Sequence, residues 1–289
     1  MKQRVREYWE HHPNALSHGM GHDPGTREFC EAVASHRYTA EPCILEMAGF
    51  DRWAGRRVLE VGCGMGTDLR RFARGGGTVV GVDLTQNAVE LAREGFVLFG
   101  FLGEFVVADA EALPFRDEVF DLVYSHGMIH HTPDPKAAVR EIYRVVSPGG
   151  EARVMVYHRD SYFAKVIVGM LVGPATRALL WVFPGGKLPR AIDRILPRRL
   201  KDMYLILAEH GYSPARVLAL STDPSFPGDG NANPLSRCYS RREAREMFSL
   251  FRFCETHVRQ LYYAGFMPMG LRRWVEKRLG WFLFVRAVK

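Results

Sequence analysis

The chain has 289 residues, of which 47% are hydrophobic and 25% are charged. This is the composition of a globular protein with a sizeable core, and it excludes a mostly disordered chain, a collagen-like chain and a disulfide scaffold. The length leaves room for one large α/β domain, or for one domain with an insertion. The five cysteines are widely spaced and form no CxxC pair, so we expect free thiols, a cytoplasmic location and no structural zinc.

The net charge of +7 is divided unevenly along the chain. Residues 1–157 hold 17 Lys/Arg and 22 Asp/Glu, whereas residues 158–289 hold 22 and 10, which indicates different roles for the two halves. The N-terminus lacks the apolar segment of a secretory signal. The most apolar stretch, 163–183, is interrupted by Lys165, Pro174 and Arg177. We therefore expect a helix in a lid or on a surface there, too interrupted to span a membrane.

An alternation of strand and helix patterns begins near residue 57. Apolar, β-branched runs predict strands at 57–61, 78–82, 104–108, 120–125 and 152–157. Thr85 is a candidate N-cap for the helix after the second strand, and the SPGG sequence at 147–150 is typical of a turn. Strands separated by helices predict an α/β fold with a parallel, doubly wound sheet.

The same patterns predict four regions. Residues 1–50 are expected to form a helical cap with two helices, and residues 51–157 the core. Residues 158–249 combine helical segments with Pro/Gly breaks and read as a helical substrate-lid insertion. Strand patterns return at 251–260 and 281–288, so residues 250–289 are expected to complete the core.

A glycine turn of sequence GCGMG (62–66) follows the first strand and precedes a helix. Such a turn lets the backbone approach a ligand closely. A nicotinamide dinucleotide fingerprint would require Gly or Ala where Thr67 stands, which argues against an oxidoreductase. Asp83 ends the second strand, where its carboxylate can accept both hydroxyls of a ribose. Asp109 ends the third strand, where it can accept an adenine amino group. Open α/β sheets bind ligands at this edge.

Four segments carry a more specific resemblance: LEVGCGMGTD, GVDLT, ADAEALPFRDEVFDLVYSHGMIHHTPDP and EIYRVVSPGG. Together they resemble the motifs of class I S-adenosylmethionine-dependent methyltransferases, over roughly residues 57–157. The likeness is greatest to the small-molecule type that includes the ubiquinone/menaquinone C-methyltransferases. The resemblance implies a Rossmann-like, seven-stranded sheet of order 3-2-1-4-5-7-6, with strand 7 antiparallel. It also implies S-adenosyl-L-methionine as cofactor and S-adenosyl-L-homocysteine as product.

The resemblance further implies which residues bind the cofactor. They follow the first four strands, and comprise Glu60, Gly62, Cys63 and Gly64 at the methionine end, Asp83 at the ribose, Leu84, Asp109 and Ala110 at the adenine, and Ser125 and His126 below the sulfonium. Methyl transfer to a hydroxyl or a protonated amine also needs a general base. The candidate catalytic residues are His130, His131, Tyr157 and His158, with His126 also at a strand end. Packing or hydrogen bonding is the alternative role for the histidines.

Tyr8 and Trp9, in the segment VREYWEHHPN, are candidates to close over substrate, together with Tyr157. The alternative is that this segment is an amphipathic helix packed on the core. The basic second half has three alternative roles: a solvated helix face, attraction of an anionic substrate, or an interfacial helix that brings the enzyme to lipids. Without an RNA-binding motif, its basic clusters do not predict a nucleic-acid site. We expect no metal, since the N-terminal histidines lack Cys or carboxylate at ligand spacing.

The predicted function is therefore methyl transfer from S-adenosyl-L-methionine to a small biosynthetic metabolite with an anionic or aromatic part. O-methylation is favoured over N- or C-methylation. One alternative is a lipophilic, membrane-associated acceptor such as a quinone or a lipid precursor. Two rival functions are a nicotinamide oxidoreductase and a non-catalytic binding module with a methyltransferase fold. The sequence leaves the oligomeric state open.

Overall fold

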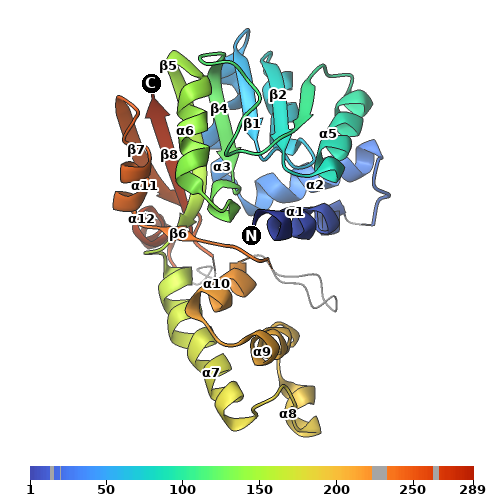
Figure 1. The fold of residues 1–289 in the computed structure, drawn as a ribbon, viewed down its shortest axis with the longest axis vertical. Coiled ribbons are helices and arrows are strands. Elements are labelled where there is room, and N and C mark those ends of the chain that lie inside the picture. Colours follow the sequence, from blue (N-terminus) through green and yellow to red (C-terminus); the bar gives the residue numbers. More distant parts are fainter. Residues whose placement is uncertain (14–15, 20, 223–232, 263–266) are drawn as a thin grey trace.

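The computed structural model describes residues 1–289 except 14–15, 20, 223–232 and 263–266. It also does not describe the side chains of residues 17, 198 and 199. An α/β part holds the sheet, and a helical part projects from it along the long axis (Figure 1). The main strands are β1 (Arg57–Val61), β2 (Thr78–Asp83), β3 (Glu104–Val107), β4 (Phe120–His126), β5 (Val146–His158), β7 (Phe253–Arg259) and β8 (Phe282–Val288). Their order is β3-β2-β1-β4-β5-β8-β7, with β8 antiparallel to both neighbours. The predicted order is therefore confirmed. A two-residue strand, β6 (Cys238–Tyr239), pairs in addition with β5.

Adjacent side chains along each strand face opposite sides of the sheet, so the core divides into two clusters. Leu59, Val80 and Val123 pack with α6 (Pro135–Val145) and α11 (Arg241–Met247). Val58 and Leu122 pack with α4 (Thr67–Arg74), α5 (Gln86–Phe99), α3 (Cys43–Ala48) and the 3₁₀ segment η2 (Phe50–Trp53). Both faces of the central strands are thus covered, which is why these strands are almost continuously apolar.

The N-terminal region holds three α-helices where two were predicted. They are α1 (Lys2–His11), α2 (Arg27–Ala40) and α3, and the 3₁₀ turn η1 (Leu16–Gly19) lies between the first two. In Figure 1, α1 runs across the edge of the sheet at which β1, β2 and β4 end. The helical cap therefore lies where parallel strands present their carboxyl ends.

The predicted turn at 147–150 is wrong, because these residues lie within β5. Val146 pairs with Phe120 and Glu151 with Leu122, so the intervening residues bulge opposite Asp121. Gly149 supplies the positive φ of +76° that the bulge requires. A turn-like composition is thus accommodated by a change of register inside one long strand.

The helical part contains the π-helix η4 (Phe163–Val172), α7 (Gly173–Val182), α8 (Arg190–Ile195), α9 (Arg198–His210) and α10 (Pro214–Thr222). A last helix, α12 (Met269–Leu279), precedes β8. The first two segments form one helix, Phe163–Val182, which is long and apolar enough to cross a membrane by length and composition alone. The helix expected in this stretch is therefore present, and Lys165, Pro174 and Arg177 do not divide it. Pro174 stands where the π-helix η4 passes into α7.

Candidate active site

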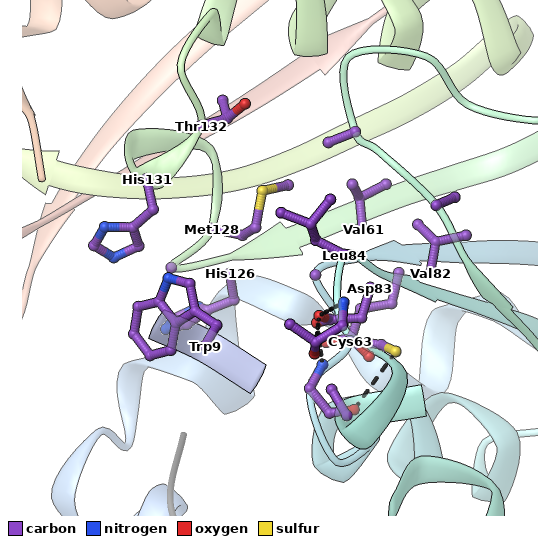
Figure 2. Close-up of a pocket in the computed structure, with 18 of the residues that line it drawn as sticks. Trp9, Val61, Cys63, Val82, Asp83, Leu84, His126, Met128, His131 and Thr132 are labelled. Atoms are coloured by element: carbon purple, nitrogen blue, oxygen red, sulfur yellow. Dashed lines mark hydrogen bonds between the residues drawn. The ribbon is translucent and has the colours of Figure 1, made fainter. Parts of the chain in front are cut away.

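A pocket lies at the carboxyl ends of β1, β2, β3 and β4 (Figure 2), where α1 contributes Lys2, Val5 and Trp9 to its lining. It brings together most of the residues predicted to bind the cofactor, namely Glu60, Gly62, Cys63, Gly64, Asp83, Leu84, Asp109, Ala110 and His126. Trp9 from α1 and His131 from the 3₁₀ turn η3 (Ile129–His131) also line it. Residues from four strand ends converge here because parallel strands end at the same edge of the sheet.

The glycine turn shapes the floor of the pocket. The backbone N–H groups of Gly62 and Cys63 donate to the carbonyl oxygen of Val82 at 2.8 and 3.0 Å, which fixes the turn to β2. A Cβ on Gly62 would come within 2.5 Å of the Met128 side chain. A Cβ on Gly64, which has φ +50°, would meet no heavy atom within 4 Å. Gly62 is thus required for packing, whereas Gly64 keeps open space above the turn.

Asp83 at the end of β2 organises the middle of the pocket. One carboxylate oxygen accepts the N–H of Gly64 at 3.0 Å, and the other accepts the N–H and hydroxyl of Thr85 at 3.1 and 2.8 Å. Burial raises the pKa of Asp83. A carboxylate has about four acceptor positions, so these three bonds leave capacity for a ligand hydroxyl.

The helix α1 is fastened across the pocket at both of its ends. The Lys2 ammonium bonds Asp109 and lies 2.6 Å from Glu111, beyond β3. At the other end, the Glu10 carboxylate accepts the N–H groups of Gln86 and Asn87 at 3.0 and 2.9 Å. Thr85 is the N-cap residue of α5, as predicted, but its side chain makes no cap hydrogen bond. The Thr85 hydroxyl donates to Asp83, and the Glu10 carboxylate caps the helix in its place.

A buried ionic network, which the sequence did not predict, closes the inner end of the pocket. The Arg37 guanidinium donates to both oxygens of Asp68 at 2.8 and 2.6 Å, and the hydroxyls of Tyr38 and Tyr124 donate to the same carboxylate at 2.9 and 3.0 Å. Burial opposes ionisation of Asp68, but Arg37 holds the pKa of Asp68 at about 2. Asp68 lies two residues after the glycine turn, in the first turn of α4, and this was the available signal.

Glu60 lies beside that network with one carboxylate oxygen that has no hydrogen-bond partner. Burial and the neighbouring Asp68 raise the pKa of Glu60 well above its ordinary value. A buried acceptor without a partner is costly. Its position on the pocket wall therefore suits a ligand that brings a positive charge or a donor.

His126 occupies the pocket wall at the end of β4. Its Nε2 atom lies 3.7 Å from a carboxylate oxygen of Glu41, and its ring packs on Phe282 and Phe284 at centroid distances of 5.6 and 5.7 Å. Burial lowers the pKa of His126, although Glu41 acts in the opposite direction. The side chain is therefore a neutral imidazole at neutral pH, with a carboxylate placed to stabilise its protonated form.

The second pocket histidine, His131, is positioned by a long-range contact. Its Nδ1 atom lies 2.7 Å from the carbonyl oxygen of Leu235 and 3.1 Å from the side-chain amide nitrogen of Asn233. Its ring lies 5.4 Å from that of Trp9. Figure 2 shows both rings at one end of the pocket.

The remaining predicted site residues do not line this pocket. Ser125 is buried, and its hydroxyl donates to the Val61 carbonyl oxygen at 2.8 Å, joining β4 to β1. The ring of His130 lies 3.8 Å from that of Tyr157, which stacks on Trp281. The Nδ1 atom of His158 lies 3.0 Å from the Gly280 carbonyl oxygen. Tyr8, next to Trp9, instead stacks on His12. Catalytic and substrate-binding roles for His130, Tyr157, His158 and Tyr8 stay predictions.

Residues 59–154 match the family model described as a methyltransferase domain. These residues therefore form a class I S-adenosylmethionine-dependent methyltransferase domain. It is 37% identical over 117 residues to a ubiquinone biosynthesis O-methyltransferase of Ralstonia nicotianae, covering 39% of this chain and 49% of the relative. It is 32% identical over 126 residues to an uncharacterised protein of Mycobacterium tuberculosis, covering 44% and 45%. The chain thus spans about half the length of the curated relatives it matches.

Solved structures agree with the methyltransferase fold. Magnesium protoporphyrin IX methyltransferase from Synechocystis, with bound S-adenosylhomocysteine, aligns over 100% of both chains with a TM-score of 0.56 and 12% identity. A protein of Thermotoga maritima described as a possible histamine N-methyltransferase aligns over 100% of both chains, with a TM-score of 0.51 and 16% identity. At these identities the likeness shows the fold alone.

The cofactor of this family is S-adenosylmethionine, and the pocket fits it in three respects. The unpartnered oxygen of Glu60 suits the ammonium at the methionine end. The open space above Gly64 admits a ligand against the turn. Asp83 retains acceptor capacity for a ribose hydroxyl, and Asp109 stands at the far end of the same pocket.

Proposed function

We propose that this chain transfers a methyl group to an oxygen of a small-molecule acceptor. The observation that carries the proposal is the neutral, buried imidazole of His126 on the pocket wall, with Glu41 behind it. A hydroxyl must lose its proton as it is methylated, and a neutral imidazole with a neighbouring carboxylate is suited to accept it. The likeness to O-methyltransferases of ubiquinone biosynthesis supports the same chemistry.

When bound, S-adenosylmethionine supplies an electrophilic methyl group on a sulfonium. In the proposed mechanism Glu60 binds the ammonium, Asp83 the ribose and Asp109 the adenine. The helix α1 covers the pocket and excludes water, which strengthens the electrostatic interactions inside. His126 accepts the proton of the acceptor hydroxyl at its imidazole, and Glu41 stabilises the imidazolium that results. Alignment of the acceptor with the methyl group supplies much of the remaining acceleration.

The aromatic rings beside the pocket favour an aromatic acceptor. The rings of Trp9 and His131 are 5.4 Å apart at one end of it. An aromatic acceptor can pack against such rings. An amine that arrives protonated would also need a proton acceptor, so the choice of oxygen over nitrogen rests on the likeness to O-methyltransferases.

A second candidate is methyl transfer to a lipophilic acceptor such as a quinol. Aromatic rings continue from the pocket toward the helix Phe163–Val182. The ring of His131 lies 5.9 Å from that of Tyr157, Tyr157 lies 4.5 Å from Trp281, and Trp281 lies 4.9 Å from Phe163. This row of packed rings joins the pocket to the most apolar helix of the molecule. Apolar surroundings on this side of the pocket would favour an apolar acceptor.

Titration calorimetry with S-adenosylhomocysteine, followed by a labelled-methyl screen, tests the proposal. The acceptors are phenols, catechols, aromatic carboxylic acids, amines and short-chain quinols. Binding with transfer to a hydroxyl supports O-methylation, and transfer to quinols alone supports the second candidate. Transfer to amines alone would overturn the assignment of oxygen. Binding with no transfer would favour a non-catalytic module, and no binding would overturn the cofactor site.

A further inference from the structure

The helix Phe163–Val182 has one packed face and one exposed apolar face. Its packed face contributes Val168 to a cluster with α9 and α10 that includes Leu207 and Val217. The opposite face exposes a run of large apolar side chains: Met170 (69%), Leu171 (57%), Trp181 (85%) and Val182 (53%). Only 17% of the residues in the most apolar window of this helix are buried. A soluble protein rarely leaves such a stripe without a partner.

Cationic side chains follow this helix in the sequence. Lys187, Arg190 and Arg194 are exposed on the next loop and on α8, where Ile195 is also 79% exposed. Between residues 163 and 210 the sequence has eight Lys/Arg and three Asp/Glu. Figure 1 places α7 and α8 at the end of the helical part, remote from the sheet. The tip of the molecule is therefore both apolar and positively charged.

We propose that this tip docks on the surface of an anionic lipid bilayer. The docking face consists of Met170, Leu171, Trp181, Val182, Lys187, Arg190, Arg194 and Ile195. Apolar side chains enter the boundary between headgroups and acyl chains, while Lys and Arg pair with anionic headgroups. An exposed tryptophan beside cations is typical of this interface.

The structure favours a helix that lies on the bilayer over one that spans it. The packed face is occupied by α9 and α10, so a spanning helix would have to leave its cluster. Lys165 pairs with Asp160 within the first turns, and Arg177 stands on the exposed side. Two copies meeting through this face would bring like charges together, which disfavours a dimer there. Charge complementarity therefore selects an anionic lipid surface.

Flotation of the full chain with vesicles tests the proposal without any need for methyl transfer. The vesicles contain phosphatidylcholine alone or phosphatidylcholine with phosphatidylglycerol. We expect binding to the anionic vesicles only, with at least a tenfold loss in the double variant Trp181→Ser/Leu171→Ser and a similar loss in Arg190→Glu/Arg194→Glu. High salt should weaken the wild-type interaction.

Trp274→Ser is the matched control, because Trp274 is also exposed (55%) and lies 4.1 Å from a cation, Arg278, but belongs to α12. It should bind vesicles as the wild type does. All variants should retain S-adenosylhomocysteine affinity, which shows that they fold and separates this test from that of the proposed function. No binding to anionic vesicles, or equal losses in the control, would overturn the proposal. A dimer of the wild type that Trp181→Ser/Leu171→Ser converts to monomer would also overturn it. Resistance of the bound protein to extraction with alkaline carbonate would do the same, because it indicates a spanning helix.

Discussion

The Nε2 atom of His126 lies 3.7 Å from a carboxylate oxygen of Glu41, although the two residues are far apart in the sequence. Glu41 is the C-cap of α2, and His126 is the last residue of β4. The distance between them therefore depends on how the N-terminal helices pack against the sheet. Because burial lowers the pKa of His126, the imidazole is unprotonated in the pH range in which a general base must act. This pair therefore provides the most direct test of the proposed chemistry.

His126→Gln should lower methyl transfer by about 10²- to 10⁴-fold, the usual contribution of a general base. In the wild type, the rate should rise with pH on the acid side, because the base must be unprotonated. This acid limb should lie below pH 6.5, because burial lowers the pKa of His126 from its ordinary value. That limb should vanish in His126→Gln and move to lower pH in Glu41→Gln, which loses the charge that favours the imidazolium. Stopped assays from pH 5 to 9 measure both effects.

His158→Gln is the matched control, because His158 is also a buried histidine at a strand end but does not line the pocket. It should retain both the rate and the acid limb. A loss of rate in His158→Gln, with His126→Gln fully active, would assign the proton acceptor to His158, which the sequence also indicated as a candidate.

Local patterns were sufficient to predict the sheet and much of the pocket. Val58, Val80 and Val123 lie in apolar runs that form buried parallel strands, and the polar residues after such runs must meet at one edge. Asp83 and Asp109 were predicted for this reason. Both line the pocket.

The missing parts depend on contacts between distant segments. Arg37, Glu41 and Lys2 come from the N-terminal helices, whose placement on the sheet no local period encodes. The same reason explains why Thr85 was predicted at the N-cap of α5 but the capping carboxylate was not. The donors at the start of α5 are satisfied by Glu10, 76 residues earlier in the chain.

Asp83→Asn should weaken binding of S-adenosylhomocysteine by about 10- to 100-fold. It removes the charge from the carboxylate proposed to bind the ribose, and a hydrogen bond to a charged group contributes about 1.5–3 kcal/mol. Calorimetry measures the affinity. The control is Asp121→Asn, whose carboxylate likewise accepts a backbone N–H, that of Arg57 at 2.8 Å, but at the opposite end of β1. Unchanged affinity in Asp83→Asn, or an equal loss in Asp121→Asn, would contradict the assignment of the ribose site.

Glu60 should make cofactor binding depend on pH. Burial, with Asp68 nearby, raises the pKa of Glu60 in the free protein, whereas a ligand ammonium beside it favours the carboxylate. Binding therefore releases a proton, and affinity for S-adenosylhomocysteine should increase with pH until the free-protein pKa is passed, by up to tenfold per pH unit. Calorimetry in buffers of different ionisation enthalpy measures the proton release. Glu60→Gln should remove the pH dependence and lower the affinity. The same slope in the variant would exclude Glu60 as its source.

Glu10→Ala should loosen α1 and destabilise α5 together. The Glu10 carboxylate caps two N–H groups at the start of α5, and loss of a helix cap typically costs about 1 kcal/mol in the free energy of unfolding. Urea unfolding measures this loss, and hydrogen exchange over residues 2–11 should become faster. S-adenosylhomocysteine should also dissociate faster, because α1 then keeps the Lys2 contacts, the bond from Asn87 to the backbone carbonyl of residue 10 and its packing, but loses both carboxylate bonds to α5. Glu7→Ala is the control on the same helix, since the Glu7 carboxylate bonds the neighbouring Gln3 side chain, and such pairs contribute only about 0.2–0.5 kcal/mol. If both variants lose the same stability and leave dissociation unchanged, the bond from Glu10 to α5 does not hold the helix over the pocket.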